Sequence, residues 1–161
     1  MAAEAPQVRP IAYSSRRLRI IVAVFALCLV GLSFLFWVGL PPSLKAAFTL
    51  SQAVTLLIIL GGFVLGLIVL GSAVVKADAD GISFRNGLSR HWYPWDRVHR
   101  FVLGPGDPWA HVLLVPTDRA FAEELDAERR MLMGIQAGDG PSAEAAVEDL
   151  NRRLREYRAS Q

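Results

Sequence analysis

The chain carries two long apolar runs in its first half, followed by a region in which apolar and polar residues alternate or recur at helical spacing. The first run, residues 20–40, contains no Asp, Glu, Lys or Arg, and the second is uncharged over residues 46–75. A helix needs about 20 mostly apolar residues to cross the hydrocarbon core, and it satisfies its own backbone in lipid. We therefore expect a transmembrane hairpin over residues 20–75, with spans at about 20–40 and 53–75.

The charges that flank these runs predict the orientation of the hairpin. Arg16, Arg17 and Arg19 precede the first run, whereas the loop between the runs holds only Lys45. Because cytoplasmic flanks collect Lys and Arg, we expect a multi-pass protein of the inner (plasma) membrane with both termini cytoplasmic. The same arginines partly resemble an export signal, but the run after them is too long for one. The basic N-terminal tail, residues 1–19, is expected to be disordered.

The second run contains a glycine pair at a spacing typical of helix packing. Gly62 and Gly66 form a G-x-x-x-G pair, which lets a neighbouring helix approach closely. The interpretation that we favour is packing against the first span of the same chain, or simply the higher glycine content of membrane helices. The other is a face through which two copies form a homodimer. Gly62 and Gly66 are the candidate helix-packing residues.

From Val74 the pattern shortens to alternating apolar and polar residues separated by turn signals. Asn86-Gly87 is a strong hairpin signal, because a type I′ turn needs positive φ at both central residues. Residues 142–158 carry apolar side chains at helical spacing, which predicts a closing amphipathic helix. The acidic stretch 118–128 is left open as helix or loop. We expect about six strands before the closing helix, near residues 75–78, 82–85, 88–93, 98–103, 110–115 and 131–135.

Three short motifs in this region resemble a known family. They are Ala79-Asp80-Gly81-Ile82, Tyr93-Pro94-Trp95-Asp96-Arg97-Val98 and Gly134-Ile135-Gln136-Ala137-Gly138-Asp139-Gly140. With two apolar runs before them, they are similar to bacterial PH-domain membrane proteins, especially the actinobacterial group named after low-molecular-weight protein antigen 6. The resemblance implies a two-helix transmembrane hairpin followed by a small α+β PH-like domain. That domain, over residues 76–161, would be a bent antiparallel sheet capped by a C-terminal α-helix.

Composition and charge narrow the classes of site and partner. Residues 76–161 carry 12 Lys and Arg against 14 Asp and Glu, a net charge of −2, which argues against nucleic-acid binding. The single cysteine, Cys28, lies in the first run, so no disulfide can form within the chain. His91, His99 and His111 lack metal-ligand spacing, and no nucleophile motif or phosphate-binding loop is present. We therefore expect no cofactor, metal or catalytic residue, with a membrane-bound enzyme of unknown class as a remote alternative.

Four arginines after the second span are the candidate lipid-facing or partner-facing residues: Arg85, Arg90, Arg97 and Arg100. Each Lys or Arg beside anionic lipid contributes about 1 kcal/mol, although ordinary positive-inside bias explains them equally well. The leading hypothesis is a non-enzymatic module that binds an unidentified protein partner or scaffolds an assembly. A sheet edge or the groove beside the helix would serve for strand addition. The alternative is weak binding of anionic lipid headgroups.

Three tryptophans fall in the same region, at Trp92, Trp95 and Trp109. An indole buries a large area, so we favour one or two of them as core residues of a small sheet. The alternative is that they anchor the domain at a membrane interface.

Overall fold

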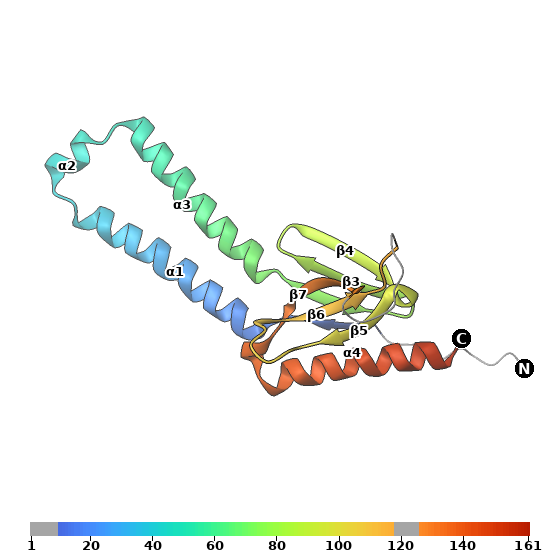
Figure 1. Cartoon of the computed structure of the whole chain (residues 1–161). Coiled ribbons are helices and arrows are strands. Elements are labelled where there is room, and N and C mark those ends of the chain that lie inside the picture. The colour runs from blue at the N-terminus through green and yellow to red at the C-terminus, as the bar shows by residue number, and fades with distance from the viewer. Residues whose placement is uncertain (1–9, 118–125) are drawn as a thin grey trace, which may run out of the picture. The chain divides into compact units, whose positions relative to one another are not determined.

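The computed structural model describes residues 10–117 and 126–161, and the chain divides into two compact units (Figure 1). The helical unit is residues 18–71, which hold most of both apolar runs. The sheet unit joins the segment before residue 18 to residues 72–161. The sheet unit is therefore built from two segments of chain that flank the helical unit.

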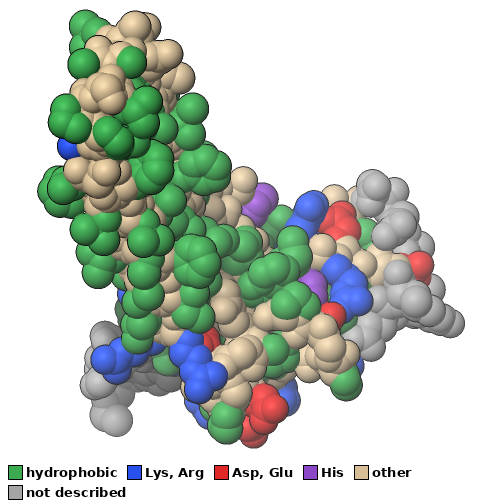
Figure 2. Space-filling model, turned by 90° about the vertical axis from the view of Figure 1, so that its left-hand side faces the viewer, with side chains coloured by type: hydrophobic (Ala, Val, Ile, Leu, Met, Phe, Trp, Pro, Cys, Tyr) green, Lys and Arg blue, Asp and Glu red, His purple; other side chains and the backbone are tan. Residues whose placement is uncertain are grey.

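The helical unit consists of two long helices joined by a short one. α1 (Arg16–Gly39) and α3 (Leu50–Gly71) are 24 and 22 residues long and apolar enough to cross a membrane. Most of their large apolar side chains are exposed, as the green surface in Figure 2 shows. α2 (Pro42–Ala47) lies between them and has proline in its first turn, where the missing N–H costs nothing. The length and composition of α1 and α3 support a membrane protein.

Both predicted spans differ from the helices at their ends. α1 begins at Arg16, so three arginines belong to its first turn and not to a tail before it. α3 ends at Gly71, and the prediction of a span reaching residue 75 is wrong there. Val74 and Val75 are apolar because they lie in a strand. The second run thus joins a helix to a strand with no charged residue between them.

The glycine pair of α3 lies in open space within the described residues. A Cβ atom added at Gly62 or Gly66 would meet no atom within 4 Å outside the helix's own backbone. A Cβ at Gly71 would lie 3.3 Å from Cγ1 of Val22 in α1. The structure therefore places α1 against α3 beside Gly71, whereas the favoured packing of α1 against Gly62 and Gly66 is not found. The homodimer face stays a prediction.

The described part of the sheet unit contains seven strands in two antiparallel sheets, where the sequence predicts about six in one bent sheet. Sheet A has the order β1-β2-β3-β4, and sheet B has the order β5-β6-β7. A short 3₁₀ helix, η1 (Trp95–Arg97), connects the two sheets. The strands are β1 (Ile11–Tyr13), β2 (Val74–Ala77), β3 (Gly81–Asn86), β4 (Ser89–Pro94), β5 (Val98–Val102), β6 (Trp109–Leu114) and β7 (Glu128–Gln136).

β1 is a strand where the sequence predicts a disordered tail. Ile11 and Tyr13 pack against the core, and Tyr13 lies opposite Val75 in an antiparallel pair with β2. Burial raises the pKa of Tyr13, which keeps its hydroxyl protonated, and this hydroxyl donates a hydrogen bond to Asp149. The predicted disordered tail is therefore wrong from Ile11 onward. Its first part, residues 1–9, lies outside the described residues.

β3 and β4 form the hairpin that Asn86-Gly87 predicts, although the turn type differs. Asn86 pairs with Ser89, so the central residues are Gly87 and Leu88. Gly87 has a φ of 62°, and no described non-glycine residue has a positive φ. Positive φ at the first central residue alone is the type II′ pattern, so the predicted type I′ turn is wrong. The side chain of Asn86 is held instead by the backbone of β7, through hydrogen bonds of 2.7 and 3.1 Å.

The predicted closing helix is confirmed as α4 (Pro141–Ala159), which follows a short 3₁₀ helix, η3 (Ala137–Asp139). The apolar side chains of α4 recur at helical spacing and pack with both sheets into one core. The buried residues of the helix are Ala143, Ala146, Leu150 and Leu154. Of the acidic stretch 118–128, residues 118–125 lie outside the described part, and Glu128 begins β7.

The three tryptophans of the sheet unit lie in different environments. Trp95 is 3% exposed and donates its indole N–H to the Asp78 carbonyl at 3.0 Å, which confirms a core role for this residue. Trp109 is half-buried. Trp92 is 55% exposed, and it lies on the face of sheet A that points away from the core, opposite Ser83. The prediction that one or two of the tryptophans are core residues is therefore confirmed by Trp95, whereas Trp92 lies on the surface.

Candidate functional site

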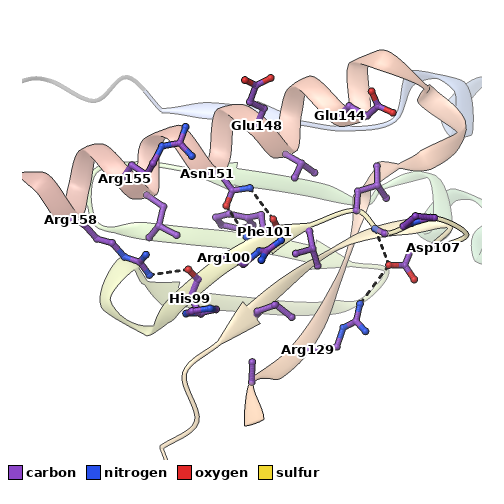
Figure 3. A pocket seen from close by; sticks show the side chains of 18 residues that line it. His99, Arg100, Phe101, Asp107, Arg129, Glu144, Glu148, Asn151, Arg155 and Arg158 are labelled. Atoms are coloured by element: carbon purple, nitrogen blue, oxygen red, sulfur yellow. Dashed lines mark hydrogen bonds and ion pairs between the residues drawn. The ribbon is translucent and has the colours of Figure 1, made fainter. Parts of the chain in front are cut away.

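A large groove lies beside strand β5 in the sheet unit. It has a volume of about 1190 Å³ and runs between β5, the turn that follows it and α4 (Figure 3). β5 is an edge strand of sheet B, so one side of it faces the groove instead of another strand. Apolar side chains from both elements line the groove, among them Phe101, Leu103, Val147 and Leu154. We call this feature the β5–α4 groove.

Asn151 of α4 closes the middle of the β5 edge. Its side-chain Oδ1 accepts the Phe101 N–H at 3.0 Å, and its Nδ2 donates to the Phe101 carbonyl at 2.9 Å. The amide of Asn151 thus satisfies both backbone groups that a neighbouring strand would otherwise pair with. An edge strand left with unpaired backbone groups is a template for association. Asn151 removes that template at Phe101.

Arg158 of α4 covers the beginning of the same edge. Its Nη2 donates to the Val98 carbonyl at 3.0 Å and to the His99 carbonyl at 2.9 Å. The two contacts lie near the irregularity where β5 shifts register against β6, between Val98 and Arg100. Backbone groups at two places on the β5 edge are therefore held by side chains of the helix.

The charges that α4 contributes to the groove are separated by sign. Glu144 and Glu148 line it toward the N-terminal end of α4, whereas Arg155 and Arg158 line it toward the C-terminal end, as Figure 3 shows. Arg100 of β5 adds a further positive charge. This arrangement gives the groove a direction, because a ligand with opposite charges at its two ends would be favoured in one orientation only.

The turn after β5 holds a second small network. Asp107 Oδ2 accepts the Gly104 N–H at 3.1 Å and lies 3.6 Å both from Arg129 Nη2 and from His111 Nδ1. Burial lowers the pKa of His111 and the positive charge of Arg129 lowers it further, while Asp107 opposes both effects. Nδ1 of His111 is buried without a hydrogen-bond partner. The network therefore contains a histidine that favours its neutral form.

A family model described as a bacterial PH domain matches residues 73–153, which is half of the chain. The chain belongs to the bacterial PH domain family. No curated protein and no solved structure matches it. The match begins just before β2 and ends within α4, so β1 lies outside it. The first strand of this PH domain therefore comes from the segment that precedes the two apolar helices in the sequence. The actinobacterial group that the motifs suggest stays a prediction.

The four predicted arginines do not form one patch on the PH domain. Arg85 and Arg90 lie opposite each other on the outer face of sheet A. Arg97 follows β4 in η1, and its Nε donates to the Val115 carbonyl at 3.0 Å. Arg100 lines the β5–α4 groove on sheet B. A single lipid site made by all four arginines is therefore not assembled, and only the first two share a surface.

The three histidines considered from the sequence are also spread over the PH domain. The ring of His91 lies 5.2 Å from that of Phe84, His99 lines the β5–α4 groove, and His111 lies beside Asp107. Within residues 10–117 and 126–161, no group of three or more His, Cys, Asp or Glu side chains could hold a metal ion. The structure therefore does not bring these histidines together as a metal or catalytic set.

The functional residues that sequence reasoning missed come mainly from α4. Asn151, Arg155 and Arg158 look like ordinary polar positions of an amphipathic helix. The polar Asn151 directly follows the buried Leu150, and this position beside the apolar stripe was the one available signal. Its partner, Phe101, lies on another element, so the sequence alone does not connect the two residues.

Proposed function

We propose that this protein is a non-enzymatic, membrane-anchored PH domain that binds an extended segment of a protein partner in the β5–α4 groove. The observation that carries the proposal is the groove itself, a hollow lined by apolar and charged side chains beside an edge strand, with acidic and basic residues at opposite ends of its α4 wall. Peptide recognition commonly uses such a combination of edge strand, apolar pockets and charged ends.

The contacts of α4 favour side-chain binding over simple strand addition. A partner strand next to β5 would have to displace the Asn151 amide from both backbone groups of Phe101. The new strand would form one pair of hydrogen bonds in place of another, so the exchange contributes little net free energy, since each such bond is worth only about 0.5–1.5 kcal/mol net. The partner segment is therefore expected to place apolar side chains over Leu103 and Val147, which are only partly buried, with a basic end near Glu148 and an acidic end near Arg155.

Orientation and location are part of the same proposal. The antiparallel pairing of β1 with β2 requires the chain before α1 and the chain after α3 to share one side of the membrane. The arginine excess at Arg16, Arg17 and Arg19 favours the cytoplasm for that side. The module would then present its groove at the cytoplasmic face of the inner membrane. A phosphatase fusion after Gln161 that is active would contradict this orientation.

Site-specific photocrosslinking in intact cells tests the groove. A photoreactive amino acid is placed at Arg155, which lines the groove, or at Arg152, which is exposed on the same helix and does not line it. We expect an adduct of one reproducible mass from position 155 and none from position 152. Glu148→Arg should reduce that adduct, because it reverses the charge expected to meet the basic end of the partner segment.

Because positions 152 and 155 lie on the same helix, a comparison of their crosslinks can contradict the proposed use of the groove. Equal adducts from Arg152 and Arg155 would indicate contact without use of the groove. If position 155 yields no adduct above background in cells that express the full chain, partner binding in the β5–α4 groove is wrong.

A further inference from the structure

β1 leads into α1, and β2 follows α3. Both connections lie at the same end of sheet A. Tyr13, the last residue of β1, lies opposite Val75 near the start of β2. Only residues 14–15 separate β1 from α1, and only residues 72–73 separate α3 from β2. A linker of two residues spans at most about 7 Å. If α1 and α3 cross a bilayer, chain length alone keeps this end of sheet A near its surface.

Side chains of the sheet unit fix these two linkers. On the first, Ser15 Oγ donates to Asp139 at 3.0 Å. On the second, the guanidinium of Arg85 donates to the Ser72 carbonyl from Nε at 3.1 Å and from Nη2 at 2.7 Å. The hydrogen bond from Tyr13 to Asp149 holds β1 to α4 beside the first linker. Both linkers are therefore attached to the domain and do not act as free tethers.

The β3–β4 turn lies at this same end of sheet A. β3 runs antiparallel to β2 with Arg85 opposite Val74, so β3 ends where β2 begins. The turn carries Leu88, whose side chain is 85% exposed. A type II′ turn requires glycine at its first central position and makes no demand for an apolar residue at the second. Neither the turn geometry nor the core of the described residues therefore accounts for Leu88.

The outer face of sheet A beside this turn is basic and carries an exposed aromatic residue. Lys76, Arg85, Arg90 and Trp92 surround a shallow hollow of about 490 Å³. No Asp or Glu lines that hollow. The acidic residues of sheet A lie in the turn at its opposite end, where Asp78 accepts the N–H groups of residues 80 and 81. Charge on this sheet thus runs from positive near the linkers to negative away from them.

We propose that the β3–β4 hairpin is a second attachment to an anionic bilayer surface, in addition to the two helices. Leu88 enters the lipid interface at the tip of the hairpin. Arg90 and Lys76 contact lipid phosphates, and Trp92 lies at the headgroup level, where indoles are favoured. The surface is separate from the β5–α4 groove, so this inference goes beyond the proposed function and can hold or fail independently of it.

Fluorescence quenching in nanodiscs tests this contact with the full chain. Cys28→Ser removes the only thiol, and Leu88→Cys or Ala79→Cys then carries an environment-sensitive fluorophore such as NBD. Ala79 is the matched control, because it is exposed in the β2–β3 turn at the other end of sheet A. We expect doxyl-labelled lipid to quench most of the fluorescence at position 88 and little at position 79. The difference should be larger in discs that contain phosphatidylglycerol than in pure phosphatidylcholine.

A second labelling position separates the effect of the fluorophore from that of the native side chain. With NBD on Ser89→Cys, the protein is compared with Leu88 intact and with Leu88→Asp. Leu88→Asp should abolish most of the lipid quenching while circular dichroism stays unchanged, since the side chain is exposed. Quenching that is equal at positions 79 and 88 would overturn the proposal. So would an NBD spectrum at position 88 that is blue-shifted but not quenched by lipid, because that result means burial against protein.

Discussion

The double hydrogen bond between Asn151 and the backbone of Phe101 makes a quantitative prediction. Asn151→Ala removes bonds of 3.0 and 2.9 Å, each with a net value of about 0.5–1.5 kcal/mol. The higher helix propensity of alanine returns up to about 0.7 kcal/mol. Because the groove is open, water can reach the vacated backbone groups. We therefore expect a net local destabilisation of about 1–2 kcal/mol, which corresponds to a five- to thirtyfold change in an equilibrium constant.

Residue-resolved hydrogen exchange on the full chain in nanodiscs measures this effect. The Phe101 amide should exchange about five- to thirtyfold faster in Asn151→Ala, while the amide of the fully buried Val112 in β6 stays unchanged. Arg152→Ala is the control substitution on the same helix, and Asn151→Asp should give an intermediate rate because it keeps the acceptor and loses the donor. A Phe101 amide that exchanges at the wild-type rate in Asn151→Ala, with α4 intact, would refute the assignment of Asn151 as the residue that closes the edge.

Two further predictions concern the stability of the folded PH domain. Gly134→Ala should lower the thermal midpoint by circular dichroism, because its Cβ would lie 2.9 Å from the Val75 backbone N, and overpacking costs about 1–3 kcal/mol. Gly138→Ala, which meets no described atom within 4 Å, should leave the midpoint nearly unchanged, and equal effects would contradict the close-packing argument. Burial lowers the pKa of His111, so the unfolded state binds its proton first as the pH falls. Stability should therefore decrease as the pH drops below about 6.5, and His111→Gln should flatten that dependence; an identical pH profile for both proteins would contradict it.

The helix α4 and the β3–β4 hairpin are predictable from the sequence, because each depends on residues that are close together in the chain. The apolar stripe of α4, from Ala146 to Leu154, repeats at helical spacing over several turns and needs no knowledge of its partners. The hairpin at Gly87 is also local, because the turn lies between strands that are adjacent in sequence. The turn type was not predictable, since the Asn86 side chain bonds to β7, which comes much later in the chain.

β1 shows why the remaining part of the fold was missed. A strand of three residues is too short to establish an alternating pattern. The partner of Tyr13 is Val75, which is separated from it in the sequence by both long helices. The candidate site has the same limitation, because Phe101 and Asn151 meet only after α4 has packed on sheet B. Arg85 and Arg100 are near in sequence but lie on different sheets. A candidate lipid site defined by the positive charge of this sequence region therefore includes residues that the fold separates.

The pairing of β1 with β2 joins strands that precede and follow both long helices in the chain, so sheet A can be completed only after α3 has been synthesised. β1 leaves the ribosome before either apolar helix, and its partner strand leaves after both, so sheet A stays incomplete throughout the synthesis of the hairpin. If α1 and α3 cross a bilayer, a chain that has inserted only one of the two helices has β1 and β2 on opposite sides, where they cannot pair. Sheet A would then lack its first strand, and Ile11 and Tyr13 would be missing from the core. Completion of sheet A would then distinguish chains that have inserted both helices from chains that have inserted only one.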